Sequence, residues 1–518
     1  MIVGDIVERN ARLYPAQTAV VCDGRRLTHA ALAERARRLA NALRDRGLRR
    51  GDRVAVLAQN CPEYLEAYAA SEIAGLVTVT VNYRLAPPEV AFILQDSQPA
   101  ALLFEAQYAD LVAGLRPSLP QVQHFVCIGG EAAGAEGYEA LLAGASAAPP
   151  PERPGEDDTV YLIYTSGTSG TPKGVRLGQR GQAHMALVTS LESDVTPTDR
   201  VLLTMPLYHI GAKCTQLAYH LRGCTVVLHR AFDPRAVLET IETERITATL
   251  LAPTMLRAIL DLPDFERYDR ASLRTVFYSA APMPVDLLRR AIATFGPIFM
   301  QLYGMTEIGA IGTGLHKHQH MLDGDPAAVR RLASAGQALV SCEIRVVRDN
   351  GTDCAPGQPG EVLVRNPCLM QGYWNNAAAT AEALRDGWMH TGDVGILDDE
   401  DYLFIVDRKK DMVVSGGENI YPREVEVALE AHPAVREAAV IGVPDDFWGE
   451  AVKAFVVLAP GATVTEAELI EHTRQLIASY KKPRSVEFVA ELPRLPNGKV
   501  RKPALRAPYW ADRERAIT

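Results

Sequence analysis

The sequence predicts an α/β protein with a large N-terminal domain of doubly wound sheets plus a β-rich subdomain, followed by a small α+β C-terminal domain. Three observations support this fold class. The 518 residues exceed what one hydrophobic core accommodates, so two or more domains are expected. Apolar runs alternate with amphipathic stretches through most of the first 300 residues. Shorter runs of alternating polarity replace that pattern from about 335 to 407.

The first 260 residues contain the clearest succession of helical and extended patterns. Alanines and leucines recur at helical spacing, and each such stretch is followed by an apolar run. A succession of strands and helices favours parallel sheets with right-handed crossovers. The helical stretches are 28–46, 64–74 and 237–245, and the apolar runs that follow them are 51–58, 76–81 and 248–251.

The middle of the chain contains a connection and then a change of pattern. Between about 130 and 158 the sequence is rich in Ala, Gly, Pro and Glu, which predicts a surface connection. An apolar run at 160–164 then predicts a buried strand. Further on, strand patterns at 343–348 and 361–365 flank the turn signal 349–351, so an antiparallel β-rich subdomain is expected.

The domain boundary is predicted within 407–411. The basic Arg408-Lys-Lys410 lies between strand patterns at 402–406 and 412–414, as expected for a hinge. The predicted domains are therefore residues 1–407 and residues 408–518. The second domain has further elements at 421–431, 438–443 and 451–458.

Composition narrows the classes of partner. A hydrophobic content of 47% and a charged content of 23% are ordinary for a globular protein. The formal net charge of −9 argues against nucleic acid or a strongly anionic membrane as a partner. Positive charge is instead local, because Lys and Arg cluster at 408–410, 481–484 and 494–502.

The cysteines and the N-terminus indicate the compartment. Eight cysteines never form C-x-x-C or a zinc-like spacing, and most have apolar neighbours, which predicts buried reduced thiols. The first residues lack a basic stretch followed by an apolar core, so no signal peptide is expected. No apolar run approaches the ~20 residues that a membrane span needs. The expectation is a cytoplasmic protein without integral membrane association.

A loop with the composition of a phosphate cradle follows the strand at 160–164. Residues 165–174 (TSGTSGTPKG) hold three glycines, five hydroxyl side chains and one lysine. Glycines let backbone N–H groups point inward toward an anion, hydroxyls add neutral donors, and Lys173 adds a positive charge. The loop does not align with a Walker A motif. Such stretches are also found as flexible linkers, but the preceding strand and the Pro-Lys-Gly favour the cradle.

Four further motifs follow this loop, and together the five resemble those of adenylate-forming enzymes. This superfamily contains acyl- and aryl-CoA synthetases, adenylation domains of peptide synthetases, and luciferases, and the chain is most similar to fatty-acyl-CoA or aryl-CoA ligases. The resemblance covers essentially the whole chain, with the motifs in family order. They are Tyr303-Gly-Met-Thr-Glu307, His390-Thr-Gly-Asp393, residues 407–422 (DRKKDMVVSGGENIYP) and residues 493–499 (PRLPNGK).

The resemblance implies ATP, Mg²⁺ and coenzyme A as cofactor and co-substrates. Tyr303 would stack on adenine, the Thr306 hydroxyl would reach the α-phosphate, and Glu307 would bind Mg²⁺. Asp393 would bind the ribose hydroxyls, and Arg408 the ribose or a phosphate. The positions implied for ATP or AMP are Thr165, Ser166, Gly167, Thr168, Ser169, Gly170, Thr171, Lys173, Ser279, Ala280, Ala281, Tyr303, Gly304, Asp393 and Arg408.

The resemblance also implies a catalytic lysine, a hinge and a thiol tunnel, and it implies that the small C-terminal domain is mobile. Lys499 would reach the substrate carboxylate and the α-phosphate, and Lys410 would be the hinge. His209 would border both the acyl pocket and the thiol entrance. The catalytic set is thus Lys499, Thr306, Glu307 and His209, and the coenzyme A tunnel is lined by Ser415, Gly416, Gly417 and Glu418.

Residue types alone leave plainer interpretations open. Glu307 fits an exposed helix start, and Asp393 fits an N-cap or a turn. Lys499 fits a surface turn, and His209 fits a core histidine. Three imidazoles in His316-Lys-His-Gln-His320 fit a metal site, but no acidic or cysteine partner lies close in sequence, so a solvated loop is favoured.

The substrate is expected to be a simple carboxylic acid. Residues 204–219 contain no Asp or Glu to pair with an amino acid's ammonium group. Small residues predict a roomy pocket for an aryl or medium-to-long acyl group. Lys213 would meet a polar substrate end or, preferably, solvent. The pocket residues are Tyr208, Gly211, Gly309 and Ala310, with Ala212, Gly312 and Cys214 as neighbours.

The predicted reaction is ATP-dependent ligation of the acid to coenzyme A, through an acyl-adenylate, with release of pyrophosphate and AMP. The chain stops soon after Lys499, which favours free coenzyme A over a carrier domain, and basic residues at 408–410 and 481–484 would meet its phosphates. The alternatives are an acyl-AMP ligase loading a separate carrier protein, a non-catalytic nucleotide-binding protein and a luciferase-type oxygenase. Monomer and homodimer both stay open.

Overall fold

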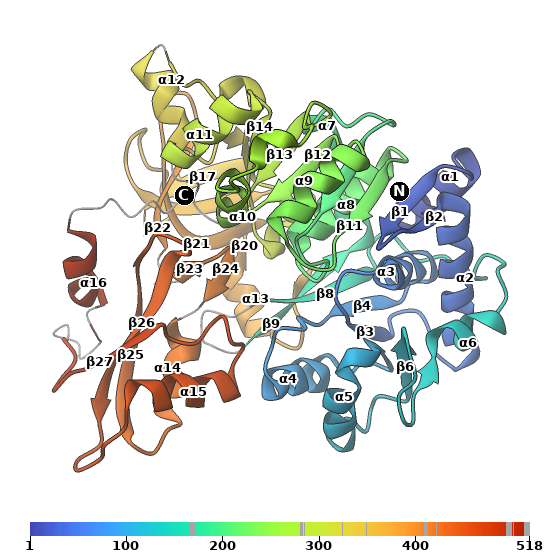
Figure 1. The fold of residues 1–518 in the computed structure, drawn as a ribbon, viewed down its shortest axis with the longest axis horizontal. Coiled ribbons are helices and arrows are strands. Elements are labelled where there is room, and N and C mark those ends of the chain that lie inside the picture. Colours follow the sequence, from blue (N-terminus) through green and yellow to red (C-terminus); the bar gives the residue numbers. More distant parts are fainter. Residues whose placement is uncertain are drawn as a thin grey trace.

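Two large, mostly parallel sheets form most of the molecule, and a small C-terminal sheet lies beside them (Figure 1). The computed structural model describes residues 1–165, 172–279, 283, 285–323, 325–348, 350–408, 413–420, 422–493, 500 and 502–511. Its helices of five or more residues are α1 (Gly4–Leu13), α2 (His29–Asp45), α3 (Pro62–Ala74), α4 (Pro87–Ser97), α5 (Ala109–Leu115), α6 (Tyr138–Ala143), α7 (Gln179–Glu192), α8 (Ile210–Leu221), α9 (Pro234–Thr243), α10 (Pro253–Leu260), α11 (Val285–Phe295), α12 (Pro326–Arg330), α13 (Ala377–Ala383), α14 (Pro422–Glu430), α15 (Glu466–Leu476) and α16 (Lys502–Trp510).

The first sheet carries the glycine-rich loop. Its strand order is β19-β9-β8-β4-β3-β5-β6-β7. The strands from β8 to β7 pair in parallel, while β9 pairs antiparallel with both β8 and β19. These strands are β3 (Arg53–Leu57), β4 (Val77–Thr80), β5 (Ala101–Glu105), β6 (His124–Ile128), β7 (Glu136–Gly137), β8 (Thr159–Thr165), β9 (Lys173–Gly178) and β19 (Gly372–Tyr373).

The second sheet carries the Tyr303 motif at the end of β14. Its order is β16-β15-β14-β13-β12-β10-β11-β1-β2, parallel from β14 to β1 and antiparallel at both edges. These strands are β1 (Thr18–Cys22), β2 (Arg25–Thr28), β10 (Arg200–Leu203), β11 (Thr225–Leu228), β12 (Ala248–Leu251), β13 (Thr275–Tyr278), β14 (Phe299–Tyr303), β15 (Thr313–Leu315) and β16 (Gln337–Ala338).

Both large sheets are buried on two faces, as the apolar runs predicted. In β3, Val54 and Val56 join the central hydrophobic cluster, whereas Ala55 and Leu57 join a second cluster on the opposite face. Alternate residues of a strand point to opposite faces, so a strand covered on both sides is apolar throughout. The doubly wound α/β fold expected from the sequence is confirmed.

Two smaller sheets complete the fold. An antiparallel sheet contains β17 (Glu343–Val347), β18 (Gly360–Arg365), β20 (Leu384–Arg385), β21 (Trp388–Leu397) and β22 (Leu403–Arg408), which confirms the β-rich subdomain. A C-terminal sheet contains β23 (Val413–Ser415), β24 (Glu418–Ile420), β25 (Val435–Asp445), β26 (Gly449–Leu458) and β27 (Ser485–Phe488). β22 and β23 are consecutive strands in different sheets.

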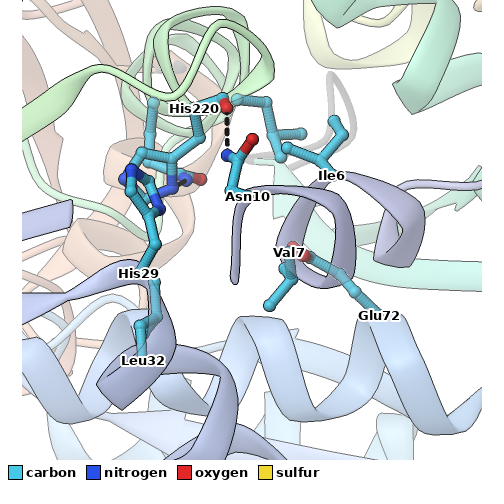
Figure 2. A pocket seen from close by; sticks show the side chains of 9 residues that line it. Ile6, Val7, Asn10, His29, Leu32, Glu72 and His220 are labelled. Atoms are coloured by element: carbon cyan, nitrogen blue, oxygen red, sulfur yellow. Dashed lines mark hydrogen bonds between the residues drawn. The ribbon is translucent and has the colours of Figure 1, made fainter. Parts of the chain in front are cut away.

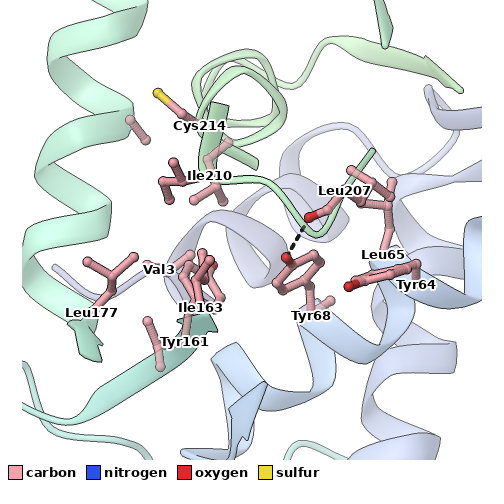
Figure 3. Packing of buried hydrophobic residues seen from close by; sticks show 14 of the residues in the cluster. Val3, Tyr64, Leu65, Tyr68, Tyr161, Ile163, Leu177, Leu207, Ile210 and Cys214 are labelled. Atoms are coloured by element: carbon pink, nitrogen blue, oxygen red, sulfur yellow. Dashed lines mark hydrogen bonds between the residues drawn. The ribbon is translucent and has the colours of Figure 1, made fainter. Parts of the chain in front are cut away.

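Helix α3 runs through the central core and is buried on every side. A helix without a solvent face is normally apolar all round, yet α3 carries three buried glutamates: Glu63, Glu66 and Glu72. Each carboxylate has a cationic partner, as a buried charge requires. The partners are Arg25, Arg35 and Lys213. Figure 3 shows this core, with Tyr68 of α3 donating a hydrogen bond of 2.7 Å to the Leu207 carbonyl.

Most of the expected elements are present. The helix expected at 28–46 is α2, with the Thr28 hydroxyl accepting a hydrogen bond from the Ala31 N–H as its N-cap. The connection expected at 130–158 is a partial error, because β7 and α6 lie within it. Tyr138 and Leu141 of α6 are buried there. Their amphipathic pattern is short and is surrounded by Ala and Gly, so the sequence did not indicate a helix. None of the helices in the described ranges is both long and apolar enough to span a membrane.

Candidate active site

The glycine-rich loop connects two paired strands. Thr165, the last residue of β8, is directly opposite Lys173, the first residue of β9. Ser166, Gly167, Thr168, Ser169, Gly170 and Thr171 lie outside the described residues. The Lys173 ammonium lies 4.9 Å from the centroid of the Tyr373 ring, a cation–π distance. The two ends of the loop and its lysine are therefore held by the edge of the first sheet.

The second sheet contributes Tyr303 to a contact with the third motif. The Tyr303 hydroxyl donates a hydrogen bond of 2.7 Å to Oδ2 of Asp393, which is buried in β21. Asp393 is directly opposite Arg408 in β22. A Cβ atom at Gly304 would lie 2.4 Å from the Ala310 carbonyl oxygen, so only glycine fits there. Two motifs 90 residues apart in sequence thus meet through a hydroxyl and a carboxylate.

Thr306 and Glu307 lie in a single 3₁₀ turn, η4 (Thr306–Ile308), and both are buried. The exposed helix start considered for Glu307 is therefore wrong. Oε1 of Glu307 accepts a hydrogen bond of 2.9 Å from the Tyr373 hydroxyl. The backbone carbonyl of Glu307 accepts a second hydrogen bond, 2.8 Å long, from the Met370 N–H. Both partners come from the segment that leads into β19, which the sequence did not single out.

His209 meets a residue of the C-terminal sheet. Its Nε2 atom lies 3.4 Å from Oε2 of Glu418, whose Oε1 accepts a bond of 2.9 Å from Arg84. Burial alone would raise the pKa of Glu418, but the charges of His209, Arg84 and Lys481 outweigh it, so this pKa lies below the usual range. His209 is half-exposed at the N-cap of α8, so it is not a core histidine.

The turn before Glu418 packs against Trp448 of the C-terminal region and against Ala252, which follows β12 of the second large sheet. Ser415, the last residue of β23, is buried, and Gly416 and Gly417 have φ angles of 59° and 81°. A Cβ atom at Gly416 would lie 2.6 Å from the Trp448 ring, and one at Gly417 would lie 3.1 Å from Ala252. Glycine is therefore needed on both counts, conformation and space.

The predicted pocket residues differ in the space around them. A Cβ atom at Gly211 would meet only Leu250, at 3.8 Å, so this position has room beside it. Gly309 is closely packed, because a Cβ atom there would lie 2.6 Å from that of Cys368. Gly309 and Ala310 both have φ of 68°, a conformation that favours glycine and small residues. Tyr208 is buried beside Tyr83, with ring centroids 5.6 Å apart.

Lys213 does not point to solvent, and this expectation is wrong. The side chain is 1% exposed, and its ammonium lies 2.7 Å from Oε1 of Glu72 and 2.7 Å from Oε1 of Gln216. It also lies 4.1 Å from the centroid of the Tyr68 ring. Burial lowers the pKa of Lys213, and Glu72 opposes that shift. Lys213 is thus a structural cation of the core.

A small cavity lies next to this ion pair (Figure 2). Asn10 donates a hydrogen bond of 2.5 Å to the His220 carbonyl at its wall. Burial lowers the pKa of His220 to about 3, so both lining histidines, His29 and His220, are neutral near pH 7. The full lining is Ile6, Val7, Asn10, His29, Leu32, Glu72, Gln216, Leu217 and His220.

The histidine run is not a solvated loop. His320 is buried, with Nε2 at 2.9 Å from the Tyr278 hydroxyl and Nδ1 at 2.8 Å from the His316 carbonyl. Desolvation lowers the pKa of His320 to about 4. Nε2 of His316 lies 3.3 Å from Glu192, an acidic partner far away in sequence. Within the described ranges, no three His, Cys, Asp or Glu side chains gather as a metal site.

Lys481 is another correction, because it was grouped with residues expected to meet coenzyme A phosphates. It is 2% exposed, and its ammonium lies 2.8 Å from Oε1 of Glu89 and 2.5 Å from Oε1 of Glu424. Arg484 is exposed, with its guanidinium 4.7 Å from the centroid of the Trp448 ring. Only the outer part of this basic cluster is therefore open to a ligand.

The remaining predicted residues are described only in part. Ser279 is half-buried directly after β13. Ala280, Ala281, Lys410 and Lys499 lie outside the described residues, as does the side chain of Arg408. Of the eight cysteines, seven are buried and Cys354 is half-buried, all as free thiols, in agreement with the sequence.

Comparison with known proteins gives a consistent assignment. The family model described as AMP-binding enzyme matches residues 7–374, and that of the AMP-binding enzyme C-terminal domain matches residues 424–499. Feruloyl-CoA synthase from Amycolatopsis sp is 42% identical over 503 residues, which cover 96% of this chain and 97% of that protein.

Solved structures agree over nearly the full length. An amide bond synthetase from Marinactinospora thermotolerans is 33% identical with a TM-score of 0.90, covering 98% of this chain and 100% of that one. A double mutant of o-succinylbenzoate CoA synthetase from Bacillus subtilis, bound to a product analogue, is 32% identical with a TM-score of 0.86. The match covers 96% of this chain and 98% of that one. The structure of the same enzyme with its acyl-adenylate intermediate has a TM-score of 0.70 and covers 96% of this chain and 97% of that one.

Proposed function

The chain belongs to the AMP-binding enzyme family, and we propose that it is an ATP-dependent ligase that joins a carboxylic acid to coenzyme A. The observation that carries this proposal is the contact between Glu418 and His209. It brings the 415–418 turn of the C-terminal sheet to the residue that borders the acyl pocket. The higher similarity to a product-bound than to an adenylate-bound relative supports a thioester-forming arrangement.

In the first half-reaction, a carboxylate oxygen of the acid attacks the α-phosphorus of ATP. The bond from this phosphorus to the bridging oxygen breaks, and pyrophosphate leaves. Thr165, Lys173 and the loop between them hold the leaving phosphates, and Thr306 donates to the α-phosphate. Asp393, whose carboxylate is held by the Tyr303 hydroxyl, accepts hydrogen bonds from the ribose hydroxyls. Catalysis here depends on positioning and on charge complementarity.

The residues at Glu307 fit a magnesium ion. The buried Glu307 carboxylate supplies hard oxygen donors, and Mg²⁺ usually takes one or two carboxylates together with substrate phosphates and water. Bound there, the ion would offset negative charge on the phosphates. Lys499 would act beside it on the α-phosphate and the carboxylate during adenylation.

In the second half-reaction, the thiol of coenzyme A gives its proton to water and attacks the acyl carbon. The bond from that carbon to the phosphate oxygen breaks, and AMP leaves. Ser415, Gly416 and Gly417 directly precede Glu418, whose carboxylate contacts His209. A slender pantetheine arm would pass this turn. We assign residues 1–407 and 408–518 to the two domains, with Lys410 as the hinge between them. The consecutive strands β22 and β23 support that division, since they belong to different sheets.

The acid is assigned to the aryl class, with phenylpropenoic acids first. The open side of Gly211 leaves room for a planar ring, and the identity of 42% to a feruloyl-CoA synthase supports the choice. Buried cysteines support a reducing cytoplasmic compartment.

Pyrophosphate release with ATP and a panel of aryl and alkyl acids tests the first step. Mass spectrometry of the products with free coenzyme A tests the second. We expect thioester and AMP in equal amounts with aryl acids. Pyrophosphate release without thioester, together with acyl transfer to a carrier-protein thiol, would instead establish the carrier-loading reaction.

A further inference from the structure

One buried tyrosine outside the recognised motifs contacts two charged residues of the nucleotide site. The Tyr373 hydroxyl lies 2.9 Å from Oε1 of Glu307, and the face of its ring lies 4.9 Å from the Lys173 ammonium. Tyr373 is 9% exposed and Glu307 is 6% exposed, so little water competes for the hydrogen bond between them. The hydroxyl donates to the proposed magnesium ligand, while the ring packs against the lysine of the phosphate loop.

The backbone around Tyr373 is fixed from both sides. β19 pairs with β9, which places Tyr373 opposite Val175. The Tyr373 N–H donates to the Thr380 hydroxyl at 2.9 Å, and the next N–H, that of Trp374, donates to the Gly174 carbonyl at 2.7 Å. A side chain anchored in this way can hold its two contacts in one geometry, which is what preorganisation of a charged site requires.

We propose that Tyr373 is a positioning residue for ATP and its metal ion: its hydroxyl orients the Glu307 carboxylate, and its ring orients the Lys173 ammonium. This inference rests on the proposed function, because it takes Glu307 as the metal ligand. The two contacts use different parts of one side chain. Removing the hydroxyl and removing the whole ring therefore have different consequences.

Tyr373→Phe deletes the hydroxyl and keeps the ring. A hydrogen bond to a charged group is worth roughly a factor of ten or more in an equilibrium. We expect about tenfold weaker Mn²⁺ binding in the presence of ATP, followed by electron paramagnetic resonance without acid or coenzyme A. ATP affinity measured without metal stays at the wild-type value. Saturating metal restores the rate of pyrophosphate release.

Tyr373→Leu removes both contacts. We expect the same loss of Mn²⁺ affinity together with weaker binding of metal-free ATP by about fivefold, because the Lys173 ammonium loses an aromatic face worth about 1 kcal/mol when partly desolvated. A merely structural role for Tyr373 would lower the melting temperature of both variants without separating the two affinities.

Tyr138→Phe is the matched control. The Tyr138 hydroxyl donates 2.7 Å to the buried Glu66 carboxylate, so this variant loses the same kind of bond away from the site. A similar change in metal affinity in this control would overturn the proposal, as would a Tyr373→Phe variant with wild-type Mn²⁺ affinity.

Glu307→Gln separates failure of the inference from failure of the function. If Glu307→Gln weakens Mn²⁺ binding and Tyr373→Phe does not, Tyr373 is not a positioning residue and the proposed function stands. If Glu307→Gln leaves Mn²⁺ binding unchanged, the metal assignment is wrong, and the role of Tyr373 falls with it. Thioester formation by the wild type is measured in a separate assay, so the proposed ligase activity is tested independently of the role of Tyr373.

Discussion

Oε2 of Glu418 lies 3.4 Å from Nε2 of His209, so a residue of the C-terminal sheet contacts the N-cap of helix α8. Arg84 holds the other carboxylate oxygen at 2.9 Å. One carboxylate thus receives two partners from segments more than 120 residues apart in sequence. If this arrangement forms the thioester, the three residues stabilise it.

Glu418→Gln is therefore expected to slow thioester formation by about tenfold while adenylate formation keeps its rate, because a charge-assisted contact between the two halves is lost. Rapid-quench measurement of pyrophosphate release and of thioester in one variant separates the two steps. Glu487→Gln is the control, since Glu487 pairs with Lys453 on an exposed part of the C-terminal sheet. Equal slowing of both steps by Glu418→Gln would contradict this role.

The buried pair of Lys213 and Glu72 gives a prediction for stability. Lys213→Met leaves the Glu72 carboxylate without its cation in the core, which costs roughly 3–5 kcal/mol in the free energy of unfolding. Adding Glu72→Gln to Lys213→Met is expected to recover most of that loss. Arg38→Ala, which breaks the exposed pair with Glu34, costs about 1 kcal/mol or less. Denaturant unfolding of the wild type, Lys213→Met, Glu72→Gln, the double variant and Arg38→Ala checks this order. If the effects of the two single variants simply add in the double variant, the coupling is refuted.

The contrast between these pairs shows what the sequence could predict. Strand and helix periods are local, so β12 at 248–251 and helix α2 were predicted within a residue or two. The partner of Lys213 is 141 residues away, and that of the Tyr373 hydroxyl is 66 residues away, so no local pattern indicates them. Motif residues were found because their order resembles a known family. Tyr373 was missed because it lies in no such motif.

The carboxylate of Glu424 gives a prediction for pH dependence. Burial is the main cause that raises its pKa, to about 8, with Lys481 opposing the shift and Glu89 adding to it. A raised carboxyl pKa means that the folded state holds a proton which the unfolded state has lost above about pH 4.5. This group's contribution to stability therefore falls as the pH rises from about 4.5 to about 8.

Glu424→Gln removes that titration and keeps the shape of the side chain. We expect the variant to gain in melting temperature relative to the wild type as the pH is raised from 6 to 8.5. Lys481 keeps Glu89 as a partner in the variant, so its own charge remains compensated. A difference in melting temperature that is constant across this range would contradict the raised pKa.

Lys499→Ala is expected to lower adenylate formation by a large factor, on the order of 10³, the loss seen when one donor to a transition-state charge is removed. Thioester formation from supplied acyl-adenylate is expected to keep most of its rate, because the proposed role of the lysine is confined to the attack on the α-phosphate. Lys502→Ala is a nearby control that removes a pair with Glu426 in the same domain. An equal loss in both half-reactions would place Lys499 outside the first step.

The hinge prediction concerns Lys410, which lies between β22 and β23, two strands that belong to different sheets. The proposed rotation of the C-terminal domain between half-reactions would require a backbone torsion to change there, as at other hinges. Proline fixes φ near −65° and removes an N–H, so Lys410→Pro allows one of the two arrangements. We expect this variant to form acyl-adenylate at a near wild-type rate and to transfer the acyl group to coenzyme A at least about a hundredfold more slowly.

Lys410→Ala distinguishes the torsion from the charge, because alanine removes the ammonium and leaves φ free. It is expected to retain both half-reactions within about threefold. Rapid-quench pyrophosphate release, measured beside thioester formation in the same folded protein, provides the comparison. If Lys410→Pro slows both steps equally, proline has only lowered the stability of the protein. If it turns over thioester at the wild-type rate, rotation about this residue is not part of the mechanism.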